Sequence, residues 1–139
     1  MWLQAIAQEF NVSQGKFEEV TNGPRNRALK ALEKIKNKLS GKSVFFFPDS
    51  QLEIPLARFL VRECGMEALE VSSPYINKKI VLSDMEMLPQ GPVISEGQDV
   101  DLQIERCKSQ KPDLTICGMG LANPLAVSYT HLRAHETHE

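Results

Sequence analysis

The stretch SVFFFPDSQLEIPLARFLVRECGMEALEV, residues 43–71, decides the fold class of this chain. Residues 43–47 (SVFFF) form a short continuous apolar run, which is typical of a strand covered on both faces. Residues 67–71 (EALEV) resume a strand pattern. Between the two runs, a helical spacing places four apolar residues on one face: Leu56, Phe59, Leu60 and Cys64. Gly65 ends this helix, so the stretch predicts a βαβ unit.

The turn after the first run offers two helix starts and one possible reactive pair. Ser50 and Glu53 have the spacing of a capping box, although Pro55 is an alternative first helical residue. Asp49 and Ser50 have the chemistry of an acid and a nucleophile. Every histidine lies in the last nine residues, so no recognisable motif supplies a base, and helix capping is the favoured interpretation.

The pattern of the βαβ unit continues toward the C-terminus. A weaker helical stretch lies within residues 74–88, a third strand at 92–95 (PVIS), and a helix from Val100 that must stop before Pro112. Residues 114–117 (LTIC) predict a fourth buried strand. We therefore expect an α/β fold, a Rossmann-like open and mainly parallel sheet flanked by helices, with right-handed crossovers.

Two amphipathic helices precede this sheet. Apolar residues recur with helical spacing over residues 2–10, and again behind Pro24 up to Gly41, which is placed to close the second helix. The basic residues of the second helix are interrupted by Glu33 and predict a solvated face. The expected domains are a helical lead-in segment (1–41), an incomplete Rossmann-like domain (42–125) and a non-native tail (126–139).

Composition and charge exclude several classes of function. The 139 residues carry a net charge of −2 with a pI near 5.9, so there is no basic field for nucleic acid or anionic lipid. No apolar run approaches the roughly 20 residues of a membrane helix, and no secretory signal is recognisable. The three widely spaced cysteines suit a reducing compartment, the cytoplasm or a plastid stroma.

Ligands of parallel sheets meet the loops at the carboxyl ends of the strands. Two such loops are residues 47–50 and residues 117–124, with a further glycine at Gly97. Gly118 and Gly120 form a G-x-G that lacks the third glycine of a dinucleotide fingerprint. They indicate either close approach of the backbone to a ligand or a plain turn out of a strand.

Three groups of side chains have metal-binding chemistry, and each has a simpler explanation. Acids cluster near the predicted helix that begins at Val100, where they suit the positive end of the helix dipole: Glu96, Asp99 and Asp101. The cysteines lack C-x-x-C spacing and predict buried small hydrophobes: Cys64, Cys107 and Cys117. In a helical tail, one face would carry His131, His135, His138 and Glu139. Residues 128–139 (SYTHLRAHETHE) resemble a translated adapter sequence, so the tail is excluded from functional reasoning.

Long strings of this sequence resemble one family. Residues 45–67 (FFFPDSQLEIPLARFLVRECGME) and 95–125 (SEGQDVDLQIERCKSQKPDLTICGMGLANPL) resemble the C-terminal Rossmann-like domain of the N subunits of light-independent (dark-operative) protochlorophyllide reductases, a nitrogenase-like family. Residues 2–10 (WLQAIAQEF) and 17–24 (FEEVTNGP) fit the same subunit. The resemblance covers essentially residues 2–125.

The resemblance implies an enzyme whose catalytic component joins N and B subunits, two of each. This component reduces the D-ring double bond of protochlorophyllide to chlorophyllide a, with electrons from an ATP-dependent iron-sulfur L component that binds ATP-Mg. The resemblance also implies a [4Fe–4S] cluster whose N-subunit cysteines lie upstream of this stretch. Cys64, Cys107 and Cys117 therefore inherit no cluster role, and we expect the fragment alone to be inactive and poorly soluble.

The resemblance also implies that the loop after the fourth strand faces the substrate cleft. Its candidate residues are Gly118, Met119, Gly120, Leu121, Asn123 and Pro124. Met119, Leu121 and Leu125 suit part of an apolar pigment pocket. Two alternatives stay open: the matching subunit of chlorophyllide reductase or of a nitrogenase, and a freestanding flavodoxin-like binding module. The second needs a complete site at the strand ends, and the sequence shows none.

Overall fold

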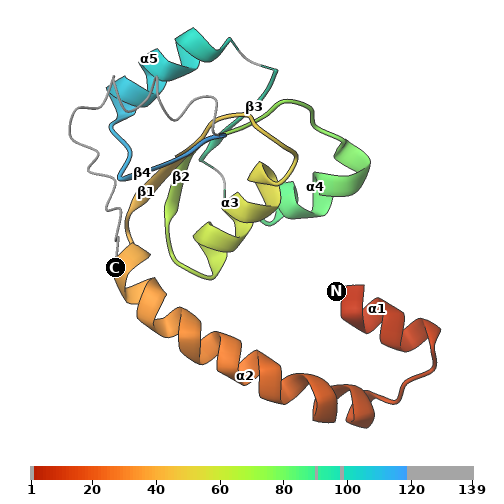
Figure 1. Cartoon of the computed structure of the whole chain (residues 1–139). Helices are drawn as coiled ribbons and strands as arrows, with labels where there is room; N and C mark the ends of the chain where they lie inside the picture. The colour runs from red at the N-terminus through yellow and green to blue at the C-terminus, as the bar shows by residue number, and fades with distance from the viewer. Residues whose placement is uncertain (1, 90, 98, 119–139) are drawn as a thin grey trace. The chain divides into compact units, whose positions relative to one another are not determined.

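The computed structural model describes residues 2–89, 91–97 and 99–118 (Figure 1). The chain divides into two compact units, residues 1–38 and residues 39–139. No helix among the described residues is long and apolar enough to cross a membrane.

The N-terminal unit consists of α1 (Trp2–Glu9) and most of α2 (Gln14–Leu39). A turn joins them, in which Asn11 has a positive φ of 52°. The two predicted helices are confirmed, but the expected start of the second is wrong, because Pro24 lies inside α2. Proline removes only one N–H from the helical ladder, and here the helix continues on both sides of it.

The second unit contains a four-stranded parallel sheet of order β3-β2-β1-β4. Its strands are β1 (Ser43–Phe46), β2 (Glu67–Ser73), β3 (Val93–Glu96) and β4 (Leu114–Ile116). The predicted α/β class and parallel sheet are confirmed. The prediction of a buried fourth strand is wrong: β4 is only partly buried, because among the described strands it has a neighbour on one side alone.

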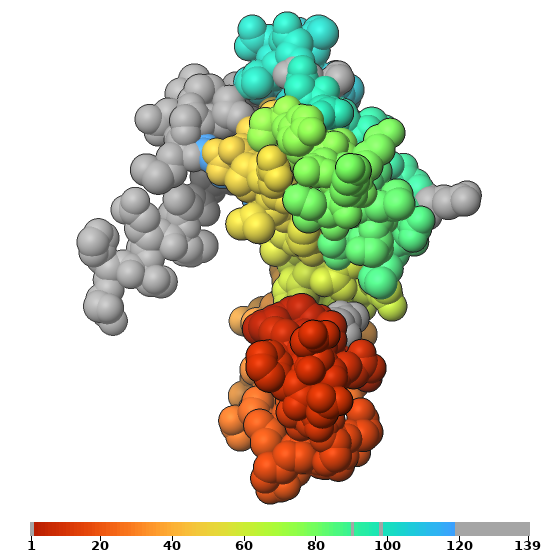
Figure 2. Space-filling view, turned by 90° about the vertical axis from the view of Figure 1, so that its right-hand side faces the viewer, coloured from red at the N-terminus to blue at the C-terminus, as the bar shows by residue number. Residues whose placement is uncertain are grey.

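Helices cover both faces of this sheet (Figure 1). One face carries α5 (Val100–Gln110), and the other carries α3 (Glu53–Arg62) and α4 (Lys78–Glu86). Figure 2 shows α4 in green against the yellow of α3, and an ion pair of 2.6 Å joins Arg58 Nε of α3 to Asp84 Oδ1 of α4.

The buried face of α3 differs from the predicted one. Leu56 is 38% exposed, whereas the residues that turn inward are Ile54, Ala57, Leu60 and Cys64. These positions follow one another by three or four residues along one side of the helix. Leu56 lies two positions after Ile54, about 200° around the helix axis, and therefore faces away from the sheet.

The core beneath α5 is built on two phenylalanines. Phe45 and Phe47 have ring centroids 5.1 Å apart, and both pack with the buried Cys107 of α5. The register between β1 and β2 shifts after Val44, so that Phe45 pairs with Glu70 and Leu69 becomes an extra residue of β2. Leu69 then joins the phenylalanine cluster, as a bulged residue re-aims its side chain.

Candidate functional site

The strand order places a switch point between β1 and β4. From β1 the chain proceeds through β2 to β3 on one side, and then returns to form β4 on the other side of β1. In open parallel sheets, ligands bind in the crevice at such a point, outside the carboxyl ends of the strands. The two loops singled out from the sequence, residues 47–50 and the start of residues 117–124, both lie at this edge.

Asp49 and Gly118 bring these two loops into contact. A Cβ atom on Gly118 would lie 1.9 Å from Asp49 Oδ1 and 2.5 Å from Asp49 Cγ. A side chain fits there only if the exposed Asp49 side chain turns away, so the glycine permits this close approach of the two loops. The Phe47 N–H also donates to the Ile116 carbonyl at 2.8 Å, which extends the pairing of β1 and β4 toward the loops.

The buried side chain of Glu53 binds the loop after β1 through hydrogen bonds. Its Oε1 accepts hydrogen bonds from the N–H groups of Asp49 at 3.0 Å and Ser50 at 2.5 Å. Its Oε2 accepts from Ser73 Oγ at 3.1 Å, which links the loop to the end of β2. A buried carboxylate needs such donors, since an unpaired one is costly to desolvate.

This arrangement corrects the predicted helix start. Glu53 reaches back to the Ser50 N–H, as in a capping box, but α3 begins at Glu53 itself. Leu52 occupies the cap position without a side-chain cap bond, and Ser50 Oγ accepts from the Leu52 N–H at 3.1 Å. Pro55 is the third helical residue and not the first. The buried glutamate therefore bonds N–H groups of the loop before α3, and α3 begins without a side-chain cap.

The acids near α5 act separately. Asp99 caps α5, and its Oδ1 accepts from the N–H groups of Asp101 at 2.9 Å and Leu102 at 3.3 Å. Glu96 Oε1 instead accepts from the Ile76 N–H at 2.9 Å. The interpretation of Asp99 as a helix-start residue is confirmed. Within residues 2–89, 91–97 and 99–118, no three metal-ligating side chains gather.

A buried polar network centred on Glu70 was not predicted. Glu70 lies in β2 with no exposed surface, and Arg106 of α5 donates to it through Nε at 2.9 Å and Nη2 at 2.8 Å. Gln103 Nε2 and Ser95 Oγ also donate to Glu70 Oε1, each at 3.1 Å. Ser72 adds a further bond. The sequence signal was an acid inside an apolar strand pattern, which demands a buried partner.

The network sets the charge of its central carboxyl. Burial by itself raises the pKa of Glu70, but hydrogen bonds from Arg106, Gln103 and Ser72 outweigh it and lower the pKa to about 2. Glu70 is therefore ionised at neutral pH and forms a charge-assisted pair with Arg106. This pair fixes α5 to the central strand and so supports the loops on either side of α5.

The cysteines behave as buried thiols. Cys64 and Cys107 are 1% and 0% exposed, which confirms that they face inward. Burial raises the pKa of the half-buried Cys117, and the charge of Asp49 and the nearby Cys107 raise it further. Cys64 follows α3 and Cys107 lies on α5, on opposite faces of the sheet. The cysteines of the described residues therefore do not fit the ligand set of an iron-sulfur cluster.

Most of the predicted cleft loop falls outside the described residues. Only Gly118 is described; the remaining candidates are Met119, Gly120, Leu121, Asn123 and Pro124, with Leu125 behind them. The histidine positions of the tail lie outside the described residues as well: His131, His135 and His138. The structure thus places the beginning of the predicted loop at the switch point and leaves its function as a prediction.

The chemistry of this edge is acidic. Asp49 is exposed at the mouth, and the Glu53 side chain takes the N–H groups of the loop before α3. A phosphate at this edge would meet the Asp49 carboxylate, and the N–H groups of Asp49 and Ser50 are already bonded to Glu53. The edge is therefore poorly suited to a nucleotide or flavin phosphate.

Comparison with known proteins gives a family. Residues 1–133 match the family described as nitrogenase component 1 type oxidoreductase. The chain is 66% identical over 124 residues to the light-independent protochlorophyllide reductase subunit N of Roseobacter denitrificans, 62% over 125 residues to that of Dinoroseobacter shibae, and 54% over 125 residues to that of Rubrivivax gelatinosus. These matches cover 89%, 90% and 90% of this chain and 29% of each relative. The chain therefore belongs to the nitrogenase component 1 type oxidoreductases.

Proposed function

We propose that this chain is part of the N subunit of a light-independent protochlorophyllide reductase. The identity of 66% over 124 residues to a protein of that name carries the proposal. The whole enzyme reduces the D-ring double bond of protochlorophyllide to give chlorophyllide a. This chain spans 29% of the length of that relative, so it supplies one portion of the catalytic subunit.

The proposed partners are the B subunit of the same reductase and the ATP-dependent iron-sulfur L component, which binds ATP-Mg. A [4Fe–4S] cluster serves the complex, with ligands outside this chain, since the described cysteines are dispersed and two of the three are buried. The proposed location is the bacterial cytoplasm, or the chloroplast stroma for a plastid-encoded chain.

The proposed role of the described residues is to form one wall of the substrate cleft. Asp49 and Gly118 approach closely at the switch point, where the two loops meet, and we propose that residues 118–125 face the pigment. Met119, Leu121 and Leu125 would present apolar side chains, which suit a porphyrin better than charged groups. The chain alone is expected to be inactive, because the other walls and the cluster ligands lie elsewhere.

A chimeric subunit tests this function. Residues 2–125 replace the matching stretch of the Roseobacter denitrificans N subunit, and the chimera is assembled with the B and L components of that organism. We expect ATP-dependent reduction of protochlorophyllide in the dark, measured as an increase in the absorbance of chlorophyllide. An assembled chimera that reduces chlorophyllide but not protochlorophyllide would assign the chain to the related chlorophyllide reductases.

Two paired variants of the chimera test the cleft loop. Met119→Asp with Leu121→Asp places charge where an apolar pigment is expected, and should weaken pigment binding by at least roughly tenfold. Lys108→Asp, an exposed change on α5, serves as the matched control and should leave the affinity unchanged. Equal affinity in both variants would remove the loop from the substrate site.

We also propose the domain limits 1–41, 42–125 and 126–139, with the last segment foreign to the subunit. The relatives align over 124 or 125 residues, whereas the family match extends to residue 133. Sequencing of the source locus through codon 126 tests the proposal. Continuation of the reading frame into further subunit sequence supports it, and a genuine end at Glu139 would return the three tail histidines to consideration as a metal site.

A further inference from the structure

The N-terminal unit has almost no interior of its own. In α1 only Ala7 is buried, and α2 buries no residue along its 26 positions. The exposed large apolar residues of the two helices and the turn between them are Trp2, Leu3, Ile6, Phe10, Val12, Val20, Leu29 and Ile35. Figure 2 shows α1, in red, at the surface on the side facing the viewer. Helices in water are stabilised mainly by packing of an apolar face, so this pair requires another apolar segment to pack against it.

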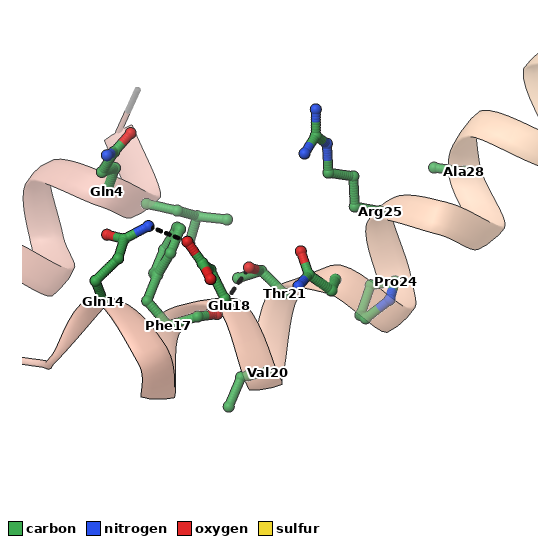
Figure 3. A pocket seen from close by; sticks show the side chains of 11 residues that line it. Gln4, Gln14, Phe17, Glu18, Val20, Thr21, Pro24, Arg25 and Ala28 are labelled. Carbon is green, nitrogen blue, oxygen red and sulfur yellow. Dashed lines mark hydrogen bonds between the residues drawn. The ribbon is translucent and has the colours of Figure 1, made fainter.

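A groove lies between α1 and the first half of α2, and a segment that packs there would bury part of this apolar surface (Figure 3). Its volume is about 900 Å³. Apolar side chains contributed by both helices line it: Leu3, Phe17, Val20, Pro24 and Ala28. In Figure 3 the Phe17 ring extends toward α1. The groove is thus a preformed apolar recess on one helix pair.

The polar residues of the groove lie beside this apolar lining. Gln14 Nε2 donates to Glu18 Oε1 at 2.6 Å, so this pair is already satisfied. Arg25 extends from α2 farther along the groove (Figure 3). One acid and one base give no net field, so a strongly charged occupant gains nothing here. The recess instead suits an apolar segment with polar flanks, as in helix-in-groove packing.

We propose that an apolar segment of the same subunit, from the part of the polypeptide outside this chain, occupies the groove. The inference rests on the proposed function, because it takes the full subunit to be as long as its relatives, of which this chain spans 29%. A helix pair that buries almost no apolar residues needs its packing partner while it folds. The remainder of its own polypeptide is present from the start, whereas another subunit arrives only at assembly.

Hydrogen exchange and limited trypsin digestion test this occupant. The chimeric N subunit described above, without B or L, is compared with the isolated chain at a concentration where sedimentation shows a monomer. Trypsin can cut α2 after Arg25 and Arg27, beside the groove. We expect cleavage there to be at least about tenfold slower in the chimera, since cleavage follows the population of the open form. Amide exchange in α1 and α2 should slow in parallel.

Matched variants show whether the protection comes from the groove. Val20→Asn removes an apolar lining residue that is 61% exposed, and should restore cleavage in the chimera. Lys30→Asn introduces the same residue on the same helix outside the groove, and should leave the protection intact. Leu3→Asn provides a second lining variant on α1, with the same expected result as Val20→Asn.

Four results would overturn the proposal. Equally rapid cleavage of the isolated chain and the chimera would show that nothing in the subunit covers the groove. Protection that appears only after the B subunit is added would assign the groove to that subunit. Protection of the chimera that grows with its own concentration would assign the groove to a second copy of the subunit. Cleavage of the monomeric isolated chain that is already as slow as in the chimera would assign the groove to this chain itself. Reductase activity is measured separately: an active chimera with an open groove refutes this inference alone, and an inactive chimera with a covered groove refutes only the proposed function.

Discussion

Gly118 is a residue at which one added atom meets a close neighbour. Alanine there would bring its Cβ within 1.9 Å of Asp49 Oδ1, so the exposed Asp49 side chain must turn away. We expect Gly118→Ala to lower the free energy of unfolding by about 0.5–1 kcal/mol, less than overpacking in a core does. In an Asp49→Ala background the same change should cost much less, because Oδ1 and Cγ are gone. Urea unfolding of the four proteins measures this coupling, and equal costs in both backgrounds would refute the contact.

Glu70 should make stability depend on acid pH. Its folded pKa of about 2 lies below the ordinary value of 4.5. Its ionised form therefore stabilises the fold fully above pH 4.5, and that contribution is lost as the pH falls from 4.5 toward 2. Glu70→Gln should remove this part of the pH dependence, and should also lower stability at pH 7 by about 3 kcal/mol, because Arg106 loses its partner.

The measurement for Glu70 is the unfolding free energy at pH 7 and pH 3, for the natural chain and for Glu70→Gln. Asp113 complicates the natural curve, since hydrogen bonds from Lys42 and Ser43 also lower its pKa to about 2. Asp113→Asn is therefore the comparison variant, and Glu70→Gln is measured in that background as well. A pH dependence that is unchanged by Glu70→Gln would show that the carboxyl is not held ionised in the fold.

Among the elements, α5 has the best-defined start. The Asp99 side chain accepts two backbone hydrogen bonds there, whereas Asp101 is only an acid in the first turn. We expect Asp99→Ala to cost about 1 kcal/mol of unfolding free energy, the usual cost of a lost cap. Asp101→Ala should cost only a few tenths, roughly 0.3 kcal/mol, from the helix dipole. Thermal denaturation of the two variants measures these losses, and equal losses of unfolding free energy would contradict the role of Asp99 as the cap.

The chain as a whole should associate in solution. Eight large apolar residues of α1, α2 and the turn between them are exposed, and so are Ile80 and Leu82 of α4. Exposed apolar surface promotes association or aggregation. Sedimentation velocity should show an average mass above 15.6 kDa that rises with concentration. A monodisperse monomer that melts cooperatively at every concentration would contradict this expectation.

The local order of the chain followed from sequence patterns. Apolar runs, helical spacing and glycine stops predicted β1, α3 and β2 in order, because these signals arise from neighbours along the chain. The parallel sheet followed from the alternation of strands and helices. Long matching strings supplied the family, and nothing in the fold was needed for it.

Tertiary packing decided the features that local patterns misplaced or missed. Leu56 faces outward and Ser50 is not the cap of α3, because packing and the buried Glu53 set these details. Pro24 lies inside α2, a position that the local helix signals misplaced. Long-range contacts created the site itself. Asp49 meets Gly118 only because β1 and β4 are paired, and Glu70 meets Arg106, 36 positions away, only because α5 packs on β2. Local chemistry thus determined which elements form, and the free energy of burying them together determined which side chains meet.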